Sequence, residues 1–265
     1  MPLRRALLGL LFPITVFATT LLATTAHAAD RLRIAAVPSM APAAVTLNAA
    51  FAKAHPGSTI EIVGGTSADL GAAIEKGDAI DLLLADDEAL PKRLASSGLA
   101  DGATLTRLGL GRLALWTNTP GINPGRGRSV FAAQYVNQIA MADAATSPYG
   151  QIALSALDGL GVSEGAKPKL KAYPDDVAAA KAVQDKAADI GLVPFALMKA
   201  PGFDGVGIYI LLPGGTYEPA RHTAIVTRSG NANAAAKAYL AFLASPEARA
   251  ILAAAGFDAP DAATY

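Results

Sequence analysis

The sequence contains no cysteine. This absence excludes disulfide bonds, a thiol nucleophile, and zinc or iron–sulfur sites held by thiolates. It also excludes membrane attachment through a lipid-modified cysteine. Without such cross-links the stability of the chain must come from packing, and 265 residues with 52% hydrophobic character are enough to bury a sizeable core.

An excess of either charge is lacking as well. Lys and Arg together number 22, as do Asp and Glu, and the body of the chain has no dense Lys/Arg stretch. Proteins that bind nucleic acid or anionic membranes usually carry basic patches. We therefore expect no nucleic-acid partner, and the true partner has to be inferred from a site rather than from net charge.

Signatures of hydrolytic and nucleotide-dependent enzymes are also missing. Of the three histidines, His27 lies in the N-terminal leader, His55 ends a predicted helix, and His222 begins a predicted strand near an expected hinge. No Gly-x-Ser-x-Gly elbow and no Gly-x-x-x-x-Gly-Lys loop occurs. The acidic run at residues 86–88 is explained by capping of the helix that follows, without a metal. We expect neither enzyme activity nor a cofactor; an exported enzyme of unknown chemistry stays open as an alternative.

Residues 1–28 have the pattern of a cleavable signal peptide. Arg4 and Arg5 form a positive start, and an apolar run follows from Ala6 to about Ala23. Ala26-His27-Ala28 then supplies a small-x-small cleavage pattern, which predicts a mature periplasmic chain that begins at Ala29. The competing interpretation is a retained membrane anchor, since the run approaches the length that spans a bilayer.

After the leader, short apolar runs alternate with Ala-rich helical stretches, which is typical of an α/β protein with mostly parallel sheets and helices on both faces. The expected strands are 32–37, 59–63, 80–85, 112–117, 138–141, 170–173, 190–193, 206–212 and 223–227. The expected helices are 41–54, 68–76, 88–97, 148–160, 175–187, 233–243 and 246–255. So many strands favour two sheets over one. We predict a two-lobed fold with a ligand cleft between the lobes: residues 29–109 plus 223–265 form lobe I, and residues 110–222 form lobe II.

Four strand-to-helix junctions are candidates for a ligand site. They occupy residues 35–42, 64–70, 143–150 and 173–177. Open parallel sheets bind ligands beyond the carboxyl ends of their strands, where helix N-termini bring free N–H groups and partial positive charge. Several such N-termini directed at one point can hold an anion without Lys or Arg. At any single junction, however, a Ser, Thr or Asp before a helix is most simply explained by capping.

Short motifs follow one another at these junctions. Residues 34–40 read Ile-Ala-Ala-Val-Pro-Ser-Met, residues 66–75 read Thr-Ser-Ala-Asp-Leu-Gly-Ala-Ala-Ile-Glu, and residues 80–86 read Ile-Asp-Leu-Leu-Leu-Ala-Asp. Residues 239–248 read Tyr-Leu-Ala-Phe-Leu-Ala-Ser-Pro-Glu-Ala, and Ala-Gly-Phe follows at 255–257. In this order and spacing, the chain resembles the periplasmic molybdate-binding component of ABC transporters over essentially its whole mature length.

The resemblance implies a type II periplasmic-binding-protein fold and a small tetrahedral oxyanion, molybdate or tungstate, held by neutral donors only. Residue by residue, it implies that Ser39 and Ser67 donate a hydroxyl and a backbone N–H. Tyr149 and Val177 would donate a backbone N–H each. Molybdenum would be reached only as its oxyanion, so these four residues contact oxygen atoms and not the metal. The resemblance further implies a monomer that delivers the anion to a membrane permease.

Several positions depart from the family pattern. Pro194 and Phe195 follow the strand where the family commonly has a tyrosine whose hydroxyl reaches the anion, and neither can donate a side-chain hydrogen bond. Tyr149 stands where a small residue is usual, and Pro38 is inserted into the first motif. We hypothesise that the Tyr149 hydroxyl replaces the missing donor. The same fold binding a different oxyanion or a small organic anion stays open as the alternative.

Overall fold

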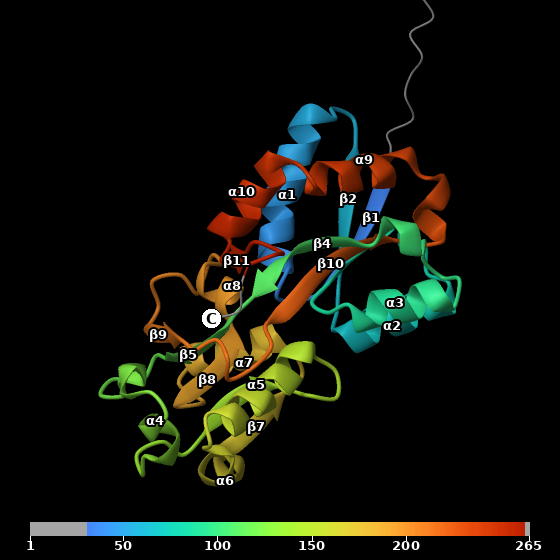
Figure 1. Ribbon diagram of the computed structural model, residues 1–265. Helices are drawn as coiled ribbons and strands as arrows, with labels where there is room; N and C mark the ends of the chain where they lie inside the picture. The colour runs from blue at the N-terminus through green and yellow to red at the C-terminus, as the bar shows by residue number, and fades with distance from the viewer. Residues whose placement is uncertain (1–30, 263–265) are drawn as a thin grey trace, which may run out of the picture.

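The computed structural model of the protein describes residues 31–262. The expected signal peptide, residues 1–28, and the alternative of a retained anchor lie outside the described residues. Between residues 31 and 262, no helix has the length and apolar character needed to cross a membrane. This part of the chain forms two β-sheets, each with helices on both faces, and Figure 1 shows one sheet above the other.

The six-stranded sheet combines strands from the two ends of the described chain. Its order is β11-β4-β10-β3-β1-β2. The strands are β1 (Arg31–Ala36), β2 (Thr59–Gly64), β3 (Leu82–Ala85), β4 (Thr106–Gly111), β10 (Ala220–Val226) and β11 (Phe257–Asp258). The helices are α1 (Ala41–Ala54), α2 (Ser67–Lys76), α3 (Ala89–Ser96), α9 (Ala234–Leu243) and α10 (Pro246–Ala254). Helices α1, α9 and α10 cover one face and α2 and α3 the other (Figure 1), so every residue of β3 is buried.

The five-stranded sheet uses the middle of the chain, in the order β7-β6-β8-β5-β9. Its strands are β5 (Leu113–Thr117), β6 (Ile139–Ala142), β7 (Leu170–Tyr173), β8 (Ile190–Pro194) and β9 (Ile208–Leu211). The associated helices are α4 (Ser129–Ala132), α5 (Pro148–Gly159), α6 (Ser163–Ala166), α7 (Asp176–Gln184) and α8 (Phe195–Met198). Apolar clusters lie on both faces, one under α5 and one under α7. Trp116 belongs to the second cluster, and its indole N–H donates to Val206 O at 2.8 Å.

The prediction of mostly parallel sheets needs correction, because both sheets are mixed. Strand β1 pairs in parallel with β2 and β3, and β6 pairs in parallel with β7 and β8. The pairings of β10 with β3 and β4, of β11 with β4, and of β5 with β8 and β9 are antiparallel. The antiparallel strands β4, β5 and β10 are those at which the chain passes between the sheets. They enter without the helical crossover that makes neighbouring strands parallel.

Two strands and several single-turn elements escaped sequence analysis, because none of them has the residue pattern by which a strand or helix is predicted. Strand β4 contains Gly109 and Gly111, which weaken a strand pattern, and β11 is only two residues long. The single-turn helices α4, α6 and α8 and the 3-10 turns η1 (Gly102–Thr104), η2 (Pro124–Arg126), η3 (Lys167–Lys169) and η4 (Ser229–Ala232) are also too short to show a period. The longer predicted strands and helices match the structure with shifts of a few residues at their ends.

The chain passes between the two sheets at two places that lie close together. Strand β4 ends at Gly111 in the first sheet and β5 begins at Leu113 in the second, while residues 212–219 return the chain from β9 to β10. The Tyr149 hydroxyl lies 3.1 Å from His222 Nε2 at this point. A Cβ atom on Gly111 would overlap both groups. The absence of a side chain at residue 111 therefore allows the first crossing to approach this pair.

Gly111→Ala is expected to destabilise the protein by about 1–3 kcal/mol, because the new methyl group overpacks a buried contact. Gly165→Ala is the matched control, since residue 165 is exposed and a Cβ atom there meets no atom within 4 Å. Urea unfolding followed by circular dichroism measures both variants. Equal stability of the two would contradict the close approach at the crossing.

Candidate functional site

Three side chains gather at one edge of the six-stranded sheet. Because β1, β2 and β3 run parallel, the residues that follow them emerge at the same edge. Ser39 follows β1, Ser67 begins α2 after β2, and Asp86 follows β3 directly. All three are buried. This edge faces the five-stranded sheet, since Asp86 lines a groove of about 360 Å³ whose opposite wall includes Pro148 of α5.

Ser39 has the features of a ligand donor. Its side chain is fully buried, and its hydroxyl has no hydrogen-bond partner within residues 31–262. The following helix α1 has no side-chain cap; Ala41 N–H donates to Val37 O at 3.0 Å and Pro42 has no N–H, so Ala43 holds the free N–H group of the first turn. Unsatisfied buried polar groups are rare in proteins and call for an external partner. The start of α1 therefore offers the Ser39 hydroxyl and one helix N–H group to a ligand.

Ser67 lies at the N-terminus of α2, and its hydroxyl is already engaged. Thr66 caps this helix by accepting from Asp69 N, with Asp69 returning the contact in a capping box. The Ser67 hydroxyl donates instead to Asp86 Oδ1 at 2.7 Å. Ser67 therefore joins the second junction to the carboxyl group at the end of β3.

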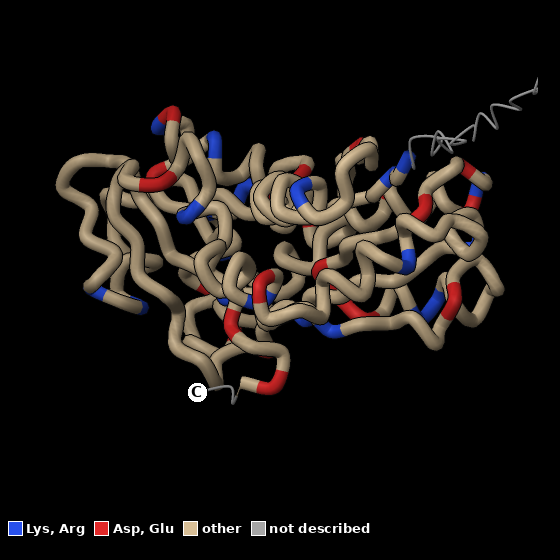
Figure 2. Tube along the Cα trace, turned by 90° about the horizontal axis from the view of Figure 1, so that it is seen from above, with Lys and Arg blue, Asp and Glu red and all other residues tan. Residues whose placement is uncertain are grey.

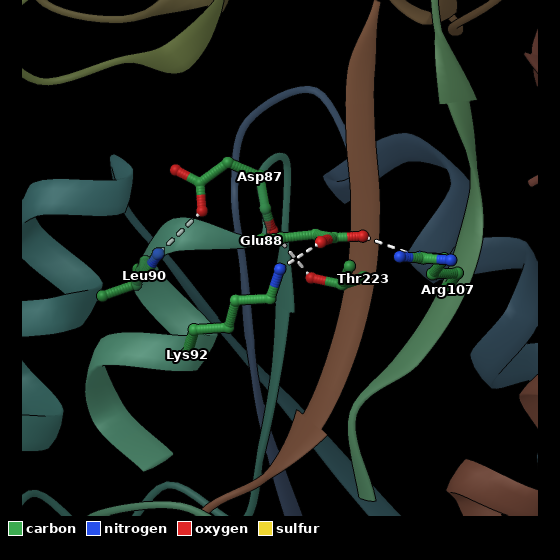
Figure 3. Close-up of polar contacts among 6 residues, drawn as sticks. All are labelled: Asp87, Glu88, Leu90, Lys92, Arg107 and Thr223. Atoms are coloured by element: carbon green, nitrogen blue, oxygen red, sulfur yellow. Dashed lines mark hydrogen bonds and ion pairs between the residues drawn. The ribbon is translucent and has the colours of Figure 1, made fainter. Parts of the chain in front are cut away.

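The neighbours of Asp86 show how this acidic run is divided. Asp87 accepts from Leu90 N at 2.9 Å and so caps α3, as the sequence predicts. Glu88 accepts from Lys92 and from Arg107, and the two cations lower the pKa of Glu88 to about 2 (Figure 3). The hydroxyl of Thr223 donates to Asp87 O, which ties the turn to β10. Asp87 and Glu88 therefore have structural roles, whereas Asp86 points inward.

On the five-stranded sheet, the helices α5 and α7 begin side by side after the parallel strands β6 and β7. Ser147 caps α5 by accepting from Tyr149 N at 3.2 Å, and its own hydroxyl donates to Asp176 Oδ1 at 3.0 Å. The Tyr149 N–H, an expected anion donor, is thus directed at the cap of its own helix. Ser147 links the third and fourth junctions, a role that the sequence does not reveal.

The start of α7 presents one free backbone donor and one buried acid. Asp175 caps the helix through Ala178 N at 2.7 Å. Val177 is the second residue of α7, so its N–H has no acceptor within the helix. Its side chain is 36% exposed, which leaves only the backbone as a contribution to a site. Asp176 is buried, and its Oδ2 atom has no partner within residues 31–262.

The Tyr149 hydroxyl lies beside the crossing between the sheets. Burial lowers the pKa of His222 to about 3 and raises the pKa of Tyr149 well above its usual value. Both groups are therefore neutral, and the tyrosine hydroxyl and His222 Nε2 share one hydrogen bond. His222, which lies near a hinge expected from the sequence, is buried on β10 beside the crossing between the sheets. The hydroxyl proposed to replace a missing anion donor thus already has a partner.

Two buried carboxyl groups from different sheets meet near these junctions. Burial raises the pKa of Asp86 to about 7 and raises that of Asp176 well above its usual value. The Asp86 charge raises the pKa of Asp176 further, so the two carboxyls lie close enough for their charges to interact. Both also raise the pKa of Tyr149. A groove of about 300 Å³ between the sheets is lined by Ser67 and Ser147, the hydrogen-bond partners of these acids.

The position after β8 carries no donor, as the sequence indicates. Pro194 is the N-cap of α8, and the Phe195 ring lies 5.3 Å from the Arg112 guanidinium and 5.5 Å from the Lys199 ammonium. The Phe195 N–H donates to Arg112 O at 2.9 Å. The backbone N–H and the ring of Phe195 therefore both contact Arg112, which lies at the crossing between the sheets.

The buried Asp86 makes the stability of the ligand-free protein depend on pH. Because its folded pKa of about 7 exceeds the value in the unfolded chain, the unfolded state ionises first as the pH rises. The free energy of unfolding should therefore fall by about 2–3 kcal/mol between pH 5 and pH 8 through this group. Asp86→Asn keeps an acceptor for Ser67 and should remove this loss. Parallel pH profiles of the two proteins in urea would contradict the assignment.

Comparison with known proteins identifies relatives along most of the chain. The molybdate-binding protein ModA of Azotobacter vinelandii is 29% identical over 184 residues, which make up 69% of this chain and 73% of the relative. The ModA protein of Rhodobacter capsulatus is 29% identical over 201 residues, 76% of this chain and 78% of the relative. The solved structure of an Azotobacter vinelandii periplasmic molybdate-binding protein matches with a TM-score of 0.79 at 26% identity, covering 87% of this chain and all of the other.

The family model for the bacterial extracellular solute-binding proteins matches residues 32–258. This match spans both sheets and every junction described above, and it agrees with the two-lobed architecture of the related solved structure. The chain belongs to the family of bacterial extracellular solute-binding proteins.

Proposed function

We propose that the protein is the periplasmic binding component of an ABC transporter and that it carries a tetrahedral oxyanion, molybdate or tungstate. The observation that carries the proposal is the fully buried Ser39 hydroxyl without a partner, at the uncapped start of α1. The relatives named as molybdate-binding proteins, which align with most of this chain, point to the same ligand.

The mode of binding follows from the donors at the site. The Ser39 hydroxyl and the backbone N–H groups of Ser67 and Val177 lie at three helix N-termini, where partial positive charge accumulates. Such preorganised neutral donors stabilise a desolvated anion without the cost of burying a cation. Acidic and basic residues are interspersed along the molecule (Figure 2), so this mode does not rely on a surface of one charge.

The proposal includes the expected cellular role. The protein acts as a monomeric binding protein rather than an enzyme, is exported after cleavage of residues 1–28, and delivers its anion to a membrane permease without binding nucleic acid. Residues 29–109 plus 223–265 and residues 110–222 move as two lobes about the crossings near Gly111 and residues 212–219. The small space available beside Gly111 supports a hinge at that place.

A different anion in the same site is the second candidate. The observation that favours it is the pair of buried carboxyls, Asp86 and Asp176, beside donors arranged for an anion. Carboxylates accept hydrogen bonds and repel a bare dianion. An oxyanion or small organic anion that carries a proton would satisfy such a site better.

Titration calorimetry with molybdate, tungstate, sulfate and phosphate separates these candidates. We expect molybdate and tungstate to bind most tightly, and Ser39→Ala to weaken their affinity by about one to two decades, since a hydrogen bond to a charged ligand contributes about 1.5–3 kcal/mol. Ser96→Ala is the matched control, because Ser96 is exposed and bonds only to Lys92 O of its own helix. Absence of heat with molybdate and tungstate, or an unchanged affinity of Ser39→Ala, would refute the proposal.

The backbone donor at Val177 has its own test. Val177→Pro removes the N–H at the second position of α7, a place where the first turn of a helix accepts proline, as Pro42 shows in α1. We expect a loss of about one to two decades in molybdate affinity. Val177→Ala keeps the N–H and should bind as the parent does. If both variants bind equally well, this N–H does not contact the anion.

A further inference from the structure

A carboxyl group with an unused oxygen lies among the anion donors. Asp176 is 2% exposed, its Oδ1 accepts from Ser147, and its Oδ2 has no partner within residues 31–262. It is the first residue of α7 and directly precedes Val177, whose N–H points to the same helix end. Asp86 differs: its Oδ1 accepts from Ser67, and neither of its carboxyl oxygens is buried without a partner within residues 31–262. The unsatisfied oxygen of Asp176 therefore requires a partner from outside the described chain.

The chemistry of that partner is constrained by charge. An ionised carboxylate only accepts hydrogen bonds, and in a desolvated site it would repel an oxyanion. Two oxygens that both carry lone pairs can approach closely only when a proton lies between them. That proton is equivalent whether it is written on the carboxyl group or on the anion, since the total charge of the pair is the same.

We propose that the anion binds together with one proton, which lies between Asp176 Oδ2 and an oxygen of the anion, so that Asp176 determines specificity. The inference rests on the oxyanion-binding function proposed above. Where Asp176 is ionised in the free protein, one anion and one proton leave the solvent; where Asp176 is already protonated, only the anion does. In both cases one hydrogen bond forms between carboxyl and anion oxygens. No bond to the central atom is broken.

The surroundings of Asp176 favour this state. Burial raises its pKa most, followed by the charge of Asp86 across the sheets, and Asp175 adds a smaller effect in the same direction, while the Ser147 hydrogen bond opposes them. The strands beneath α7 carry two titratable side chains, both on β7. The Lys171 ammonium lies 5.2 Å from the Tyr173 ring, and the Tyr173 hydroxyl accepts from Gln138. Neither supplies a cation that would keep Asp176 ionised.

A shared proton also discriminates among anions of the same shape. An oxyanion of a weak acid shares a proton readily, whereas sulfate, the anion of a strong acid, does so poorly. A site made only of neutral donors separates tetrahedral dianions by size alone. With Asp176 protonated, the site selects an anion by its basicity as well as by its size. This selection disfavours sulfate relative to molybdate or phosphate.

The test is calorimetric titration of the full mature protein with sodium molybdate from pH 6 to pH 9. Titration in two buffers of different ionisation enthalpy at each pH counts the protons taken up. We expect uptake that approaches one proton in the alkaline part of the range, with an affinity that falls up to about tenfold per pH unit there. Asp176→Asn keeps an acceptor for Ser147 and donates from its amide, so its affinity should depend less on pH and its proton uptake should fall below that of the parent by up to one proton.

Asp175→Asn is the matched control, because asparagine also caps a helix and the neighbouring carboxyl is retained. It should keep the proton uptake of the parent. Parent protein that takes up no more protons than the Asp176→Asn variant at any pH in this range would overturn this inference and leave the proposed function intact. Uptake abolished by Asp86→Asn but not by Asp176→Asn would move the proton to the wrong carboxyl and also overturn it. Failure of the parent to bind molybdate at any pH would refute the proposed function itself.

Discussion

Burial of polar groups where the two sheets face each other is the constraint on which the site depends. Ser39, Asp86, Ser147 and Asp176 are all buried there, whereas no other Asp, Glu, Lys or Arg within residues 31–262 is buried. Burial of such groups is costly unless each finds a partner. Ser67 satisfies Asp86 and Ser147 satisfies Asp176, yet the Ser39 hydroxyl and one oxygen of Asp176 stay open. The other buried side-chain atoms without a hydrogen-bond partner in residues 31–262 are Arg33 Nε and Arg112 Nε, which face carboxylates, and His222 Nδ1 beside the crossing. The open atoms of Ser39 and Asp176 lie at the helix N-termini where a ligand is proposed.

The crossing between the sheets connects this site to the rest of the molecule. Tyr149 is the second residue of α5, whose cap Ser147 contacts Asp176, and its hydroxyl bonds to His222 on β10 of the other sheet. His222 stacks edge-on against Phe257 of β11 at 4.7 Å between ring centroids. A movement of α5 relative to the six-stranded sheet must therefore either break the Tyr149–His222 bond or rotate about it. Its place beside Gly111 puts it at the crossing about which we propose that the lobes move.

Sequence periodicity was sufficient to predict the long helices and strands and the four junctions. It was not sufficient to predict which aspartate side chains point inward. At two junctions a pair of adjacent aspartates occurs, and local capping explains either member equally well. The structure shows that Asp87 and Asp175 cap helices, whereas Asp86 and Asp176 turn into the space between the sheets. That choice depends on contacts with Ser67 and Ser147, which are distant in sequence. Strand β4 was missed because its glycines serve the crossing and weaken its strand pattern.

The missing side-chain donor at Phe195 and the buried carboxyl of Asp176 have a common explanation. At the end of β8, Phe195 packs between Arg112 and Lys199 and supplies no hydroxyl. Restoring a donor there would require a side chain to leave the packing that holds the crossing. At the start of α7, by contrast, Asp176 needs only a proton to become a donor, and its burial already favours that proton. A donor that depends on a proton differs from a tyrosine in one respect: its hydrogen bond is lost when the carboxyl ionises. Exchange of a hydroxyl for a carboxyl would thus make retention of the anion respond to acidity outside the cell membrane, where no cytoplasmic buffering holds pH constant.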